Sequence, residues 1–133
     1  MEIDLFKALF QKDTAFRDRV LAFTSSFLTQ VTQNLVCNRL HHIEERLAKW
    51  LLVVQDRVDS DALHLTHDFL SHMLGIHRPG VSIAVAALER DGLVSHTRAR
   101  ITIRDRTLLE ARSCECFKAI HGDLAQLRKK LSA

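Results

Sequence analysis

The apolar residues in the first third of the chain recur at the spacing of a long helix. Residues 13–37 contain no glycine or proline, and two apolar rows run through them at alternating steps of four and three residues. The rows consist of Phe16, Val20, Phe23 and Phe27, and of Leu21, Thr24, Leu28, Val31 and Leu35. A helix with two apolar rows has two faces to bury. We expect one face to form a seam with a second copy of the chain and the other to pack on a further element. The alternative is a core helix in a monomeric bundle.

Further helices are predicted on both sides of this one. Before it, residues 3–10 have the pattern of a short amphipathic helix. After it, residues 43–57 place apolar side chains on one side and charged side chains on the opposite side. A mostly polar connector over 58–61 then leads to residues 63–65, which can pair as a small strand.

Two short helices follow, and the join between them is tight. Thr66 is a favoured N-cap residue for the first, and Gly75 fits the left-handed conformation that ends a helix. Arg78 and Pro79 then begin the second, because proline is tolerated in the first turn of a helix. This second helix is expected to span residues 78–90.

After this helix the apolar period changes to two residues, which is typical of strands. Residues 93–96 and 100–103 are predicted to form a β-hairpin around a turn at 97–99. Asp105 can cap a short helix over 106–112, and a last amphipathic helix is expected over about 114–131. The order helix, helix, glycine turn, helix and hairpin is that of a winged helix-turn-helix. The predicted fold class is therefore mainly α with a small β-hairpin wing, preceded by a long dimerisation helix.

Basic residues gather in the second half of the chain. Residues 66–133 carry a net charge of +4, whereas residues 1–65 carry −1. Five arginines fall within fifteen residues that hold two acids: Arg98, Arg100, Arg104, Arg106 and Arg112. This distribution indicates a face that binds a polyanion, with a solvated basic surface as the alternative.

Composition excludes several classes of protein. The longest uninterrupted apolar run, Ile83–Leu88, has six residues, whereas a transmembrane helix needs about 20. The N-terminus has no basic region followed by an apolar core, so no secretory signal is visible. Three cysteines are an odd number, which favours reduced thiols in the cytoplasm over a disulfide framework.

A helix that enters the major groove of DNA needs small, polar or basic side chains on its outer face. Helix 78–90 has such residues at its outward positions, and the hairpin supplies basic residues where a wing meets phosphates. The candidate DNA-binding residues are Thr66, His77, Arg78, Pro79, Ser82, Ile83, Arg90, Arg98 and Arg100.

Several motifs resemble those of the Crp/Fnr transcription regulators. The sequence CNRLH at 37–41, followed by RLAKWLL at 46–52, is similar to their dimer helix and hinge. The pattern over 65–81 is similar to their DNA-binding helices, and CEC at 114–116 matches a subgroup of the family. The resemblance covers about residues 20–118.

The resemblance implies an architecture and partners. Such regulators have an N-terminal β-roll that senses a small molecule, then a dimer helix and a winged helix. The chain resembles the part after the β-roll, with residues 1–40 as the dimerisation segment and 41–133 as the DNA-binding domain. The expected partners are double-stranded DNA and a second copy of the chain, with RNA polymerase as a further candidate and no membrane. The expected dimer interface comprises Phe16, Val20, Phe23, Phe27, Leu28, Val31 and Leu35.

Other chemistry finds less support in the sequence. Eight histidines are present, but no HExxH or paired CxxC spacing accompanies them, so we expect no metal and no cofactor. The cysteines are interpreted as packing thiols, with Cys114 and Cys116 as a redox pair in the alternative. No phosphate-binding loop or nucleophile elbow is present, so no catalytic residues and no enzyme activity are expected.

Two classes of function remain. The first is a sequence-specific transcription regulator that binds pseudo-palindromic DNA as a homodimer, with helix 78–90 in the major groove. The second is a protein-interaction and oligomerisation module on a winged-helix scaffold. The fold alone does not separate these two classes.

Overall fold

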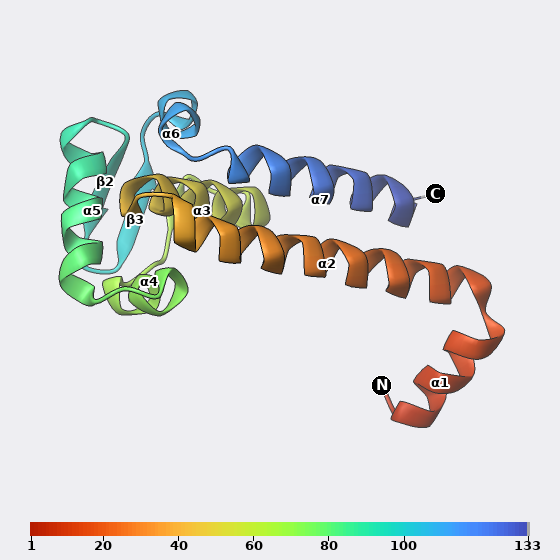
Figure 1. Cartoon of the computed structure of the whole chain (residues 1–133). Coiled ribbons are helices and arrows are strands. Elements are labelled where there is room, and N and C mark those ends of the chain that lie inside the picture. Colours follow the sequence, from red (N-terminus) through yellow and green to blue (C-terminus); the bar gives the residue numbers. More distant parts are fainter. Residues whose placement is uncertain (133) are drawn as a thin grey trace. The chain divides into compact units, whose positions relative to one another are not determined.

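The computed structural model describes residues 1–132, which form two units (Figure 1). The first contains Met1–Gln33 and the residues from Ala119 onward, and the second contains Asn34–Lys118. Most of the last helix is grouped with the first unit. Within the described residues, no helix is long and apolar enough to cross a bilayer.

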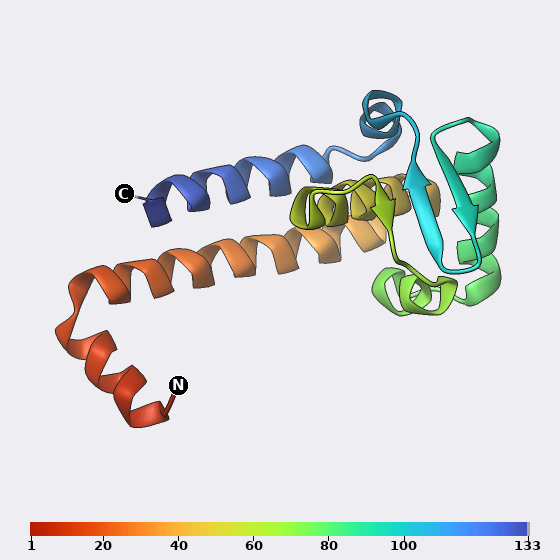
Figure 2. The ribbon, with the colours of Figure 1, turned by 180° about the vertical axis from the view of Figure 1, so that it is seen from behind.

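The described residues of the first unit form helices and no strand. Its elements are α1 (Ile3–Lys12), most of α2 (Thr14–Leu40) and most of α7 (Cys116–Ser132). In both views, α2 and α7 run antiparallel and side by side (Figures 1 and 2). The hydroxyl of Ser26 on α2 donates to the carboxylate of Asp123 on α7. The ring of Phe6 on α1 lies edge-on to that of Phe16, with 5.6 Å between centroids.

Both apolar rows of α2 remain largely exposed. Phe23, Phe27 and Leu35 are 58%, 55% and 65% exposed, and only Phe16 and Val20 are half-buried. Among the described residues of this chain, a further element packs on the rows only at their start, where Phe16 meets Phe6 of α1. The reason is that α7 meets α2 at Ala22, Ser25 and Ser26, which are small residues of a third face.

The second unit combines four further helices with a three-stranded sheet. The helices are α3 (Ile43–Val58), α4 (His67–Leu74), α5 (Arg78–Arg90) and α6 (Arg106–Arg112). The strands are β1 (Ala62–Leu63), β2 (Val94–Thr97) and β3 (Arg100–Ile103). The sheet is antiparallel in the order β1-β3-β2, and Figure 2 shows β3 between the other two strands.

The core of this unit lies between α3, α5 and the sheet. Leu47 and Leu51 on α3, Val81 and Leu88 on α5, and Ile101 on β3 are all 1% exposed or less. On α5 the buried residues fall at steps of three and four, so one face of the helix is fixed on α3 and the opposite face is left to solvent. This is the winged helix-turn-helix arrangement expected from the sequence.

Local chemistry determines the tight join between α4 and α5. The hydroxyl of Thr66 accepts a hydrogen bond from the amide of Phe69, as an N-cap does. Gly75 has φ +64° and ends α4 in the left-handed conformation. The buried guanidinium of Arg46 on α3 donates to the carbonyl of Leu74. A cation at the C-terminus of a helix is favoured by the helix dipole, so α3 holds α4 where the chain turns.

The wing differs from the prediction in two details. Thr97 pairs with Arg100, so the turn contains Arg98 and Ala99 only, one residue fewer than expected. Among the described residues other than glycine, only Asp59 has a positive φ. The turn is therefore neither type I′ nor type II′, which explains how alanine is accommodated there without glycine. The strand expected at 63–65 covers Ala62–Leu63 instead and adds a third strand to the hairpin.

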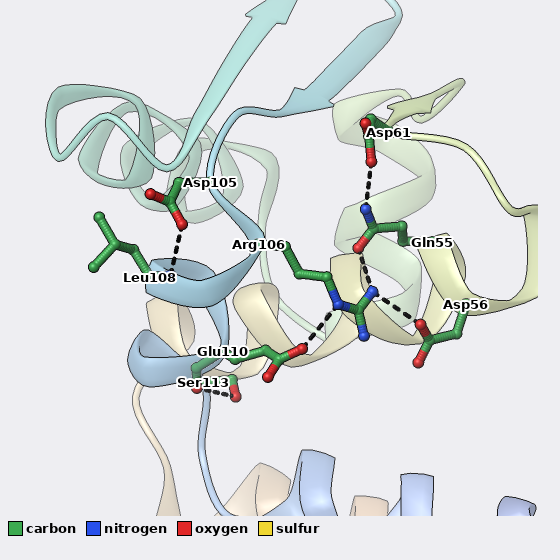
Figure 3. Close-up of polar contacts among 8 residues, drawn as sticks. All are labelled: Gln55, Asp56, Asp61, Asp105, Arg106, Leu108, Glu110 and Ser113. Atoms are coloured by element: carbon green, nitrogen blue, oxygen red, sulfur yellow. Dashed lines mark hydrogen bonds and ion pairs between the residues drawn. The ribbon is translucent and has the colours of Figure 1, made fainter.

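One member of the arginine-rich segment points into the unit. Figure 3 shows Arg106 between three partners: Gln55 at 2.6 Å, Asp56 at 2.9 Å and Glu110 at 2.8 Å. Gln55 in turn donates to Asp61 at 2.6 Å. Arg106 thus joins α3 to α6 and, through Gln55, to the segment before β1.

Candidate nucleic-acid interface

The exposed face of α5 carries the residue types that a major groove can accommodate. Its inner face is buried, and its outer face consists of Arg78, Pro79, Ser82, Ile83, Ala86 and Arg90. Ile83 is 67% exposed although it is a large apolar side chain. No bulky acidic side chain lies among these outward residues. This face was predicted from the period of the helix, and the structure places it as predicted.

An open groove of about 720 Å³ brings the N-terminal ends of α4 and α5 together with the tip of the wing. It is lined by Thr66, His67, Asp68, Arg78, His96, Thr97, Arg98 and Ala99. The structure therefore assembles three of the predicted residues, Thr66, Arg78 and Arg98, around one hollow. His77 is exposed immediately before α5, and Arg90 lies at the opposite end of that helix.

The arginines of the wing segment separate into different environments. Arg98 and Arg100 are exposed and form no ion pair with a described residue. Arg104 donates to the hydroxyl of Ser95 at 2.9 Å, and Arg112 lies 3.7 Å from Asp91. Together with the internal pairing of Arg106, this leaves Arg98, Arg100 and Arg104 as the arginines of the segment that pair with no described carboxylate.

Arg78 is held only loosely in the absence of a ligand. Its Nε lies 3.9 Å from the carboxylate of Asp68, and both side chains are about two-thirds exposed. An exposed ion pair of this kind contributes about 0–1 kcal/mol. The guanidinium can therefore leave Asp68 at small cost when a stronger acceptor is available.

Sequence reasoning missed a pair of histidines at the base of the groove. The rings of His67 on α4 and His96 on β2 lie 5.7 Å apart, and His67 Nδ1 lies 3.0 Å from the hydroxyl of Ser82. Burial lowers the pKa of His67, and the neighbouring His96 and Arg78 lower it further. The lowered pKa favours the neutral form of His67, which can hold the hydroxyl of Ser82 without adding charge. No spacing in the sequence indicates the contact between His67 and Ser82, because the two residues are fifteen positions apart and lie on different helices.

Glu89 connects the outer helix to the wing. Its carboxylate accepts from the backbone amide of His96 at 3.0 Å, and its other oxygen lies 2.9 Å from His96 Nδ1. The backbone hydrogen bond is the main reason that the pKa of Glu89 is lowered from its ordinary value. This contact ties α5 to β2, so the two elements that face a ligand are held to each other.

Comparisons with known proteins agree with this geometry. A family model described as a Crp-like helix-turn-helix domain matches residues 45–112, about half of the chain. The solved structure of a protein from Eubacterium rectale ATCC 33656, described as a transcriptional regulator of the Crp/Fnr family, has a similar fold with a TM-score of 0.66 and 21% sequence identity. That similarity covers 82% of this chain and 50% of the other, so this chain spans about half the length of that protein. No curated protein sequence matches the chain. The family match and the observed winged fold together show that the chain belongs to the family of Crp-like helix-turn-helix domains.

Proposed function

We propose that the chain is a transcription regulator that binds double-stranded DNA as a homodimer, with α5 in the major groove. The observation that carries this proposal is the exposed, acid-free face of α5 beside the unpaired arginines at the tip of the wing. The major groove is about 12 Å wide and admits one helix. A domain of this family with such a face on α5 is suited to binding DNA, and binding DNA needs no catalytic group.

Within this proposal the residues divide by what they contact. Arg78 lies in the first turn of α5, the end that meets base edges in helix-turn-helix complexes. Its guanidinium can donate to O6 and N7 of a guanine, and Ile83 can contact a thymine methyl group. Ser82 can reach a base or a phosphate. The residues assigned to phosphates are Thr66, His77, Arg90, Arg98 and Arg100.

The homodimer is proposed on the exposed rows of α2. Large contiguous apolar surface on a protein usually marks an interaction site. Two apolar rows on one helix provide a seam for a second copy of that helix. The proposed interface comprises Phe16, Val20, Phe23, Phe27, Leu28, Val31 and Leu35. Two-fold symmetry would place the two α5 helices about 34 Å apart, one turn of DNA, so the site would be a pseudo-palindrome.

Binding to a labelled random-sequence duplex at several salt concentrations tests the proposal. Each phosphate that a basic residue neutralises adds about 0.9 to the slope of log affinity against log salt. We expect a steep slope, and selection from a random DNA pool is expected to return a two-fold symmetric site. Absent or salt-insensitive binding would contradict the proposal and favour the protein-interaction module instead.

A further inference from the structure

Four side chains that the proposed function does not use meet in the second unit. They are Cys37, His41, Cys114 and Cys116, and their sulfur and nitrogen atoms all lie within 4.8 Å of one another. The three cysteines are at most 5% exposed, and the side chain of His41 is 13% exposed. Cys37 lies in the last turn of α2, with His41 four residues later. Cys116 begins α7, and Cys114 lies two residues before it in the connection from α6.

Two of the distances match those between ligands of one tetrahedral ion. Cys37 Sγ lies 3.6 Å from Cys114 Sγ, and Cys116 Sγ lies 3.6 Å from His41 Nδ1. With zinc–sulfur bonds of about 2.3 Å, two ligands of a tetrahedral zinc ion are about 3.7 Å apart. A disulfide would require about 2.05 Å between sulfurs, and the three cysteines, all within the described chain, form none. The thiols are thus free to act as ligands, and these two spacings suit one shared ion.

A buried lysine beside the cluster points to negative charge there. Lys49 on α3 is 1% exposed, and its Nζ lies 3.3 Å from Cys37 Sγ and 2.7 Å from Asn34 Oδ1. No carboxylate of the described residues forms an ion pair with it. Burying an ammonium group without an opposite charge is costly. Three thiolates, a neutral imidazole and a divalent ion carry one net negative charge, which would balance Lys49.

The histidine is oriented as metal-binding histidines usually are. His41 presents Nδ1 to the cluster, and its other ring nitrogen, Nε2, lies 3.1 Å from the carboxylate of Glu115. A carboxylate on the far nitrogen of a metal-bound imidazole fixes the tautomer and raises the basicity of the ligand. Glu115 occupies the position between the two cysteines, so the same short segment supplies two ligands and the group that orients a third.

We propose that Cys37, His41, Cys114 and Cys116 bind one zinc ion in a closed tetrahedral site. Four protein ligands leave no position for water or substrate, so the ion is structural. It fastens the end of α2 to the connection between α6 and α7, and thiols that are protonated release their protons when it binds. The sequence did not reveal this site because its two halves are more than seventy residues apart.

Metal binding by the full chain, purified under reducing conditions, tests this proposal. We expect one zinc per chain by elemental analysis. After removal of the zinc, titration with Co²⁺ is expected to saturate at one per chain, with sulfur-to-cobalt charge-transfer absorption and the intense visible bands of tetrahedral cobalt. This experiment uses the unaltered protein, and circular dichroism before and after removal of the metal reports whether it stays folded.

Variants identify the ligands. Cys116→Ser and His41→Ala are expected to weaken Co²⁺ binding and to change its spectrum, whereas His64→Ala, at an exposed histidine of the same unit, leaves both unchanged. Glu115→Gln keeps all four ligands and is expected to weaken zinc binding by about 10–100-fold. The proposal is overturned if the reduced, folded chain binds neither ion at one per chain, or if it contains iron and sulfide instead of zinc. An equal effect of the two histidine substitutions would overturn it as well.

Discussion

Arg78 and Arg100 are both exposed cations on the candidate interface, but they lie on elements that would meet different parts of a duplex. Arg78 begins α5 and Arg100 begins β3 of the wing. Base edges carry sequence information, whereas phosphates position the protein without specifying a sequence. The two residues therefore allow specificity and affinity to be separated by single substitutions.

Arg78→Ala is expected to remove the preference for one base pair in each half-site, because a bidentate arginine–guanine contact discriminates by about 1–3 kcal/mol. Arg100→Ala is expected to weaken binding to all sequences alike and to reduce the salt slope by about one per subunit. Both effects are measured by titrating the two variants against a selected site and its single-base variants. If the two substitutions altered specificity and salt slope in the same way, the proposed docking would be wrong.

Residue chemistry also shows how much of the structure the sequence could predict. Thr66, Gly75 and Asp105 act on their own neighbours in the chain, so the helix boundaries that they determine were predicted correctly. The environment of Arg106 could not be predicted from its neighbours in the chain. This arginine belongs to an arginine-rich run, but it is held inside by Asp56, fifty positions earlier in the chain. The cysteine cluster was missed for the same reason, since its ligands become neighbours only in the folded chain.

At the scale of elements, the same distinction separates correct from incorrect predictions. The bounds of α3, α4 and α5 follow from periodicity and capping residues, which are local signals. The face that α2 turns toward α7 is polar, and no hydrophobic period indicates it. The strand β1 forms because β3 offers it an edge, which a run of two residues does not reveal by itself.

The contact between α5 and β2 is expected to make stability depend on acid pH through Glu89. Since the pKa of Glu89 in the folded chain is below its ordinary value of 4.5, its contribution is fully present above that value and is lost as pH falls through the lowered pKa. Glu89→Gln should therefore lower the thermal unfolding midpoint at pH 7, by an amount that shrinks on acidification.

Thermal unfolding followed by circular dichroism measures this difference. The pH is varied from about 3 to about 7, a range that brackets the ordinary carboxylate pKa of about 4. Glu2→Gln is the matched control, because Glu2 is an exposed carboxylate without a side-chain hydrogen bond at the start of α1. If Glu89→Gln had the same thermal unfolding midpoint as the unaltered chain at pH 7, the stabilising role given to the Glu89 carboxylate would be wrong. A difference that grows as the pH falls below 4.5 would contradict that role as well.

At the scale of the whole molecule, the unexplained feature is the apolar surface of α2. The rings of Phe23 and Phe27 stack on each other at 6.4 Å between centroids, yet both are more than half exposed. Aromatic side chains supply much of the binding energy in protein interfaces when they are buried at the centre. A second copy of the chain would bury these rings against the same surface, because a two-fold interface is self-complementary.

Phe27→Asp is expected to shift the chain from dimer to monomer at micromolar concentration, because each subunit would bring a charge into the apolar seam. Loss of about 1.4 kcal/mol or more raises the dimer dissociation constant at least about tenfold, which sedimentation equilibrium can measure. The same substitution leaves α5 and the wing intact, so a single half-site should still be bound, while the advantage of a pseudo-palindrome over a half-site disappears. Leu108→Asp, at a similarly exposed apolar residue on α6, should leave the dimer unchanged. A monomeric unaltered chain would refute the proposed seam, and a Phe27→Asp variant as dimeric as Leu108→Asp would place the interface elsewhere.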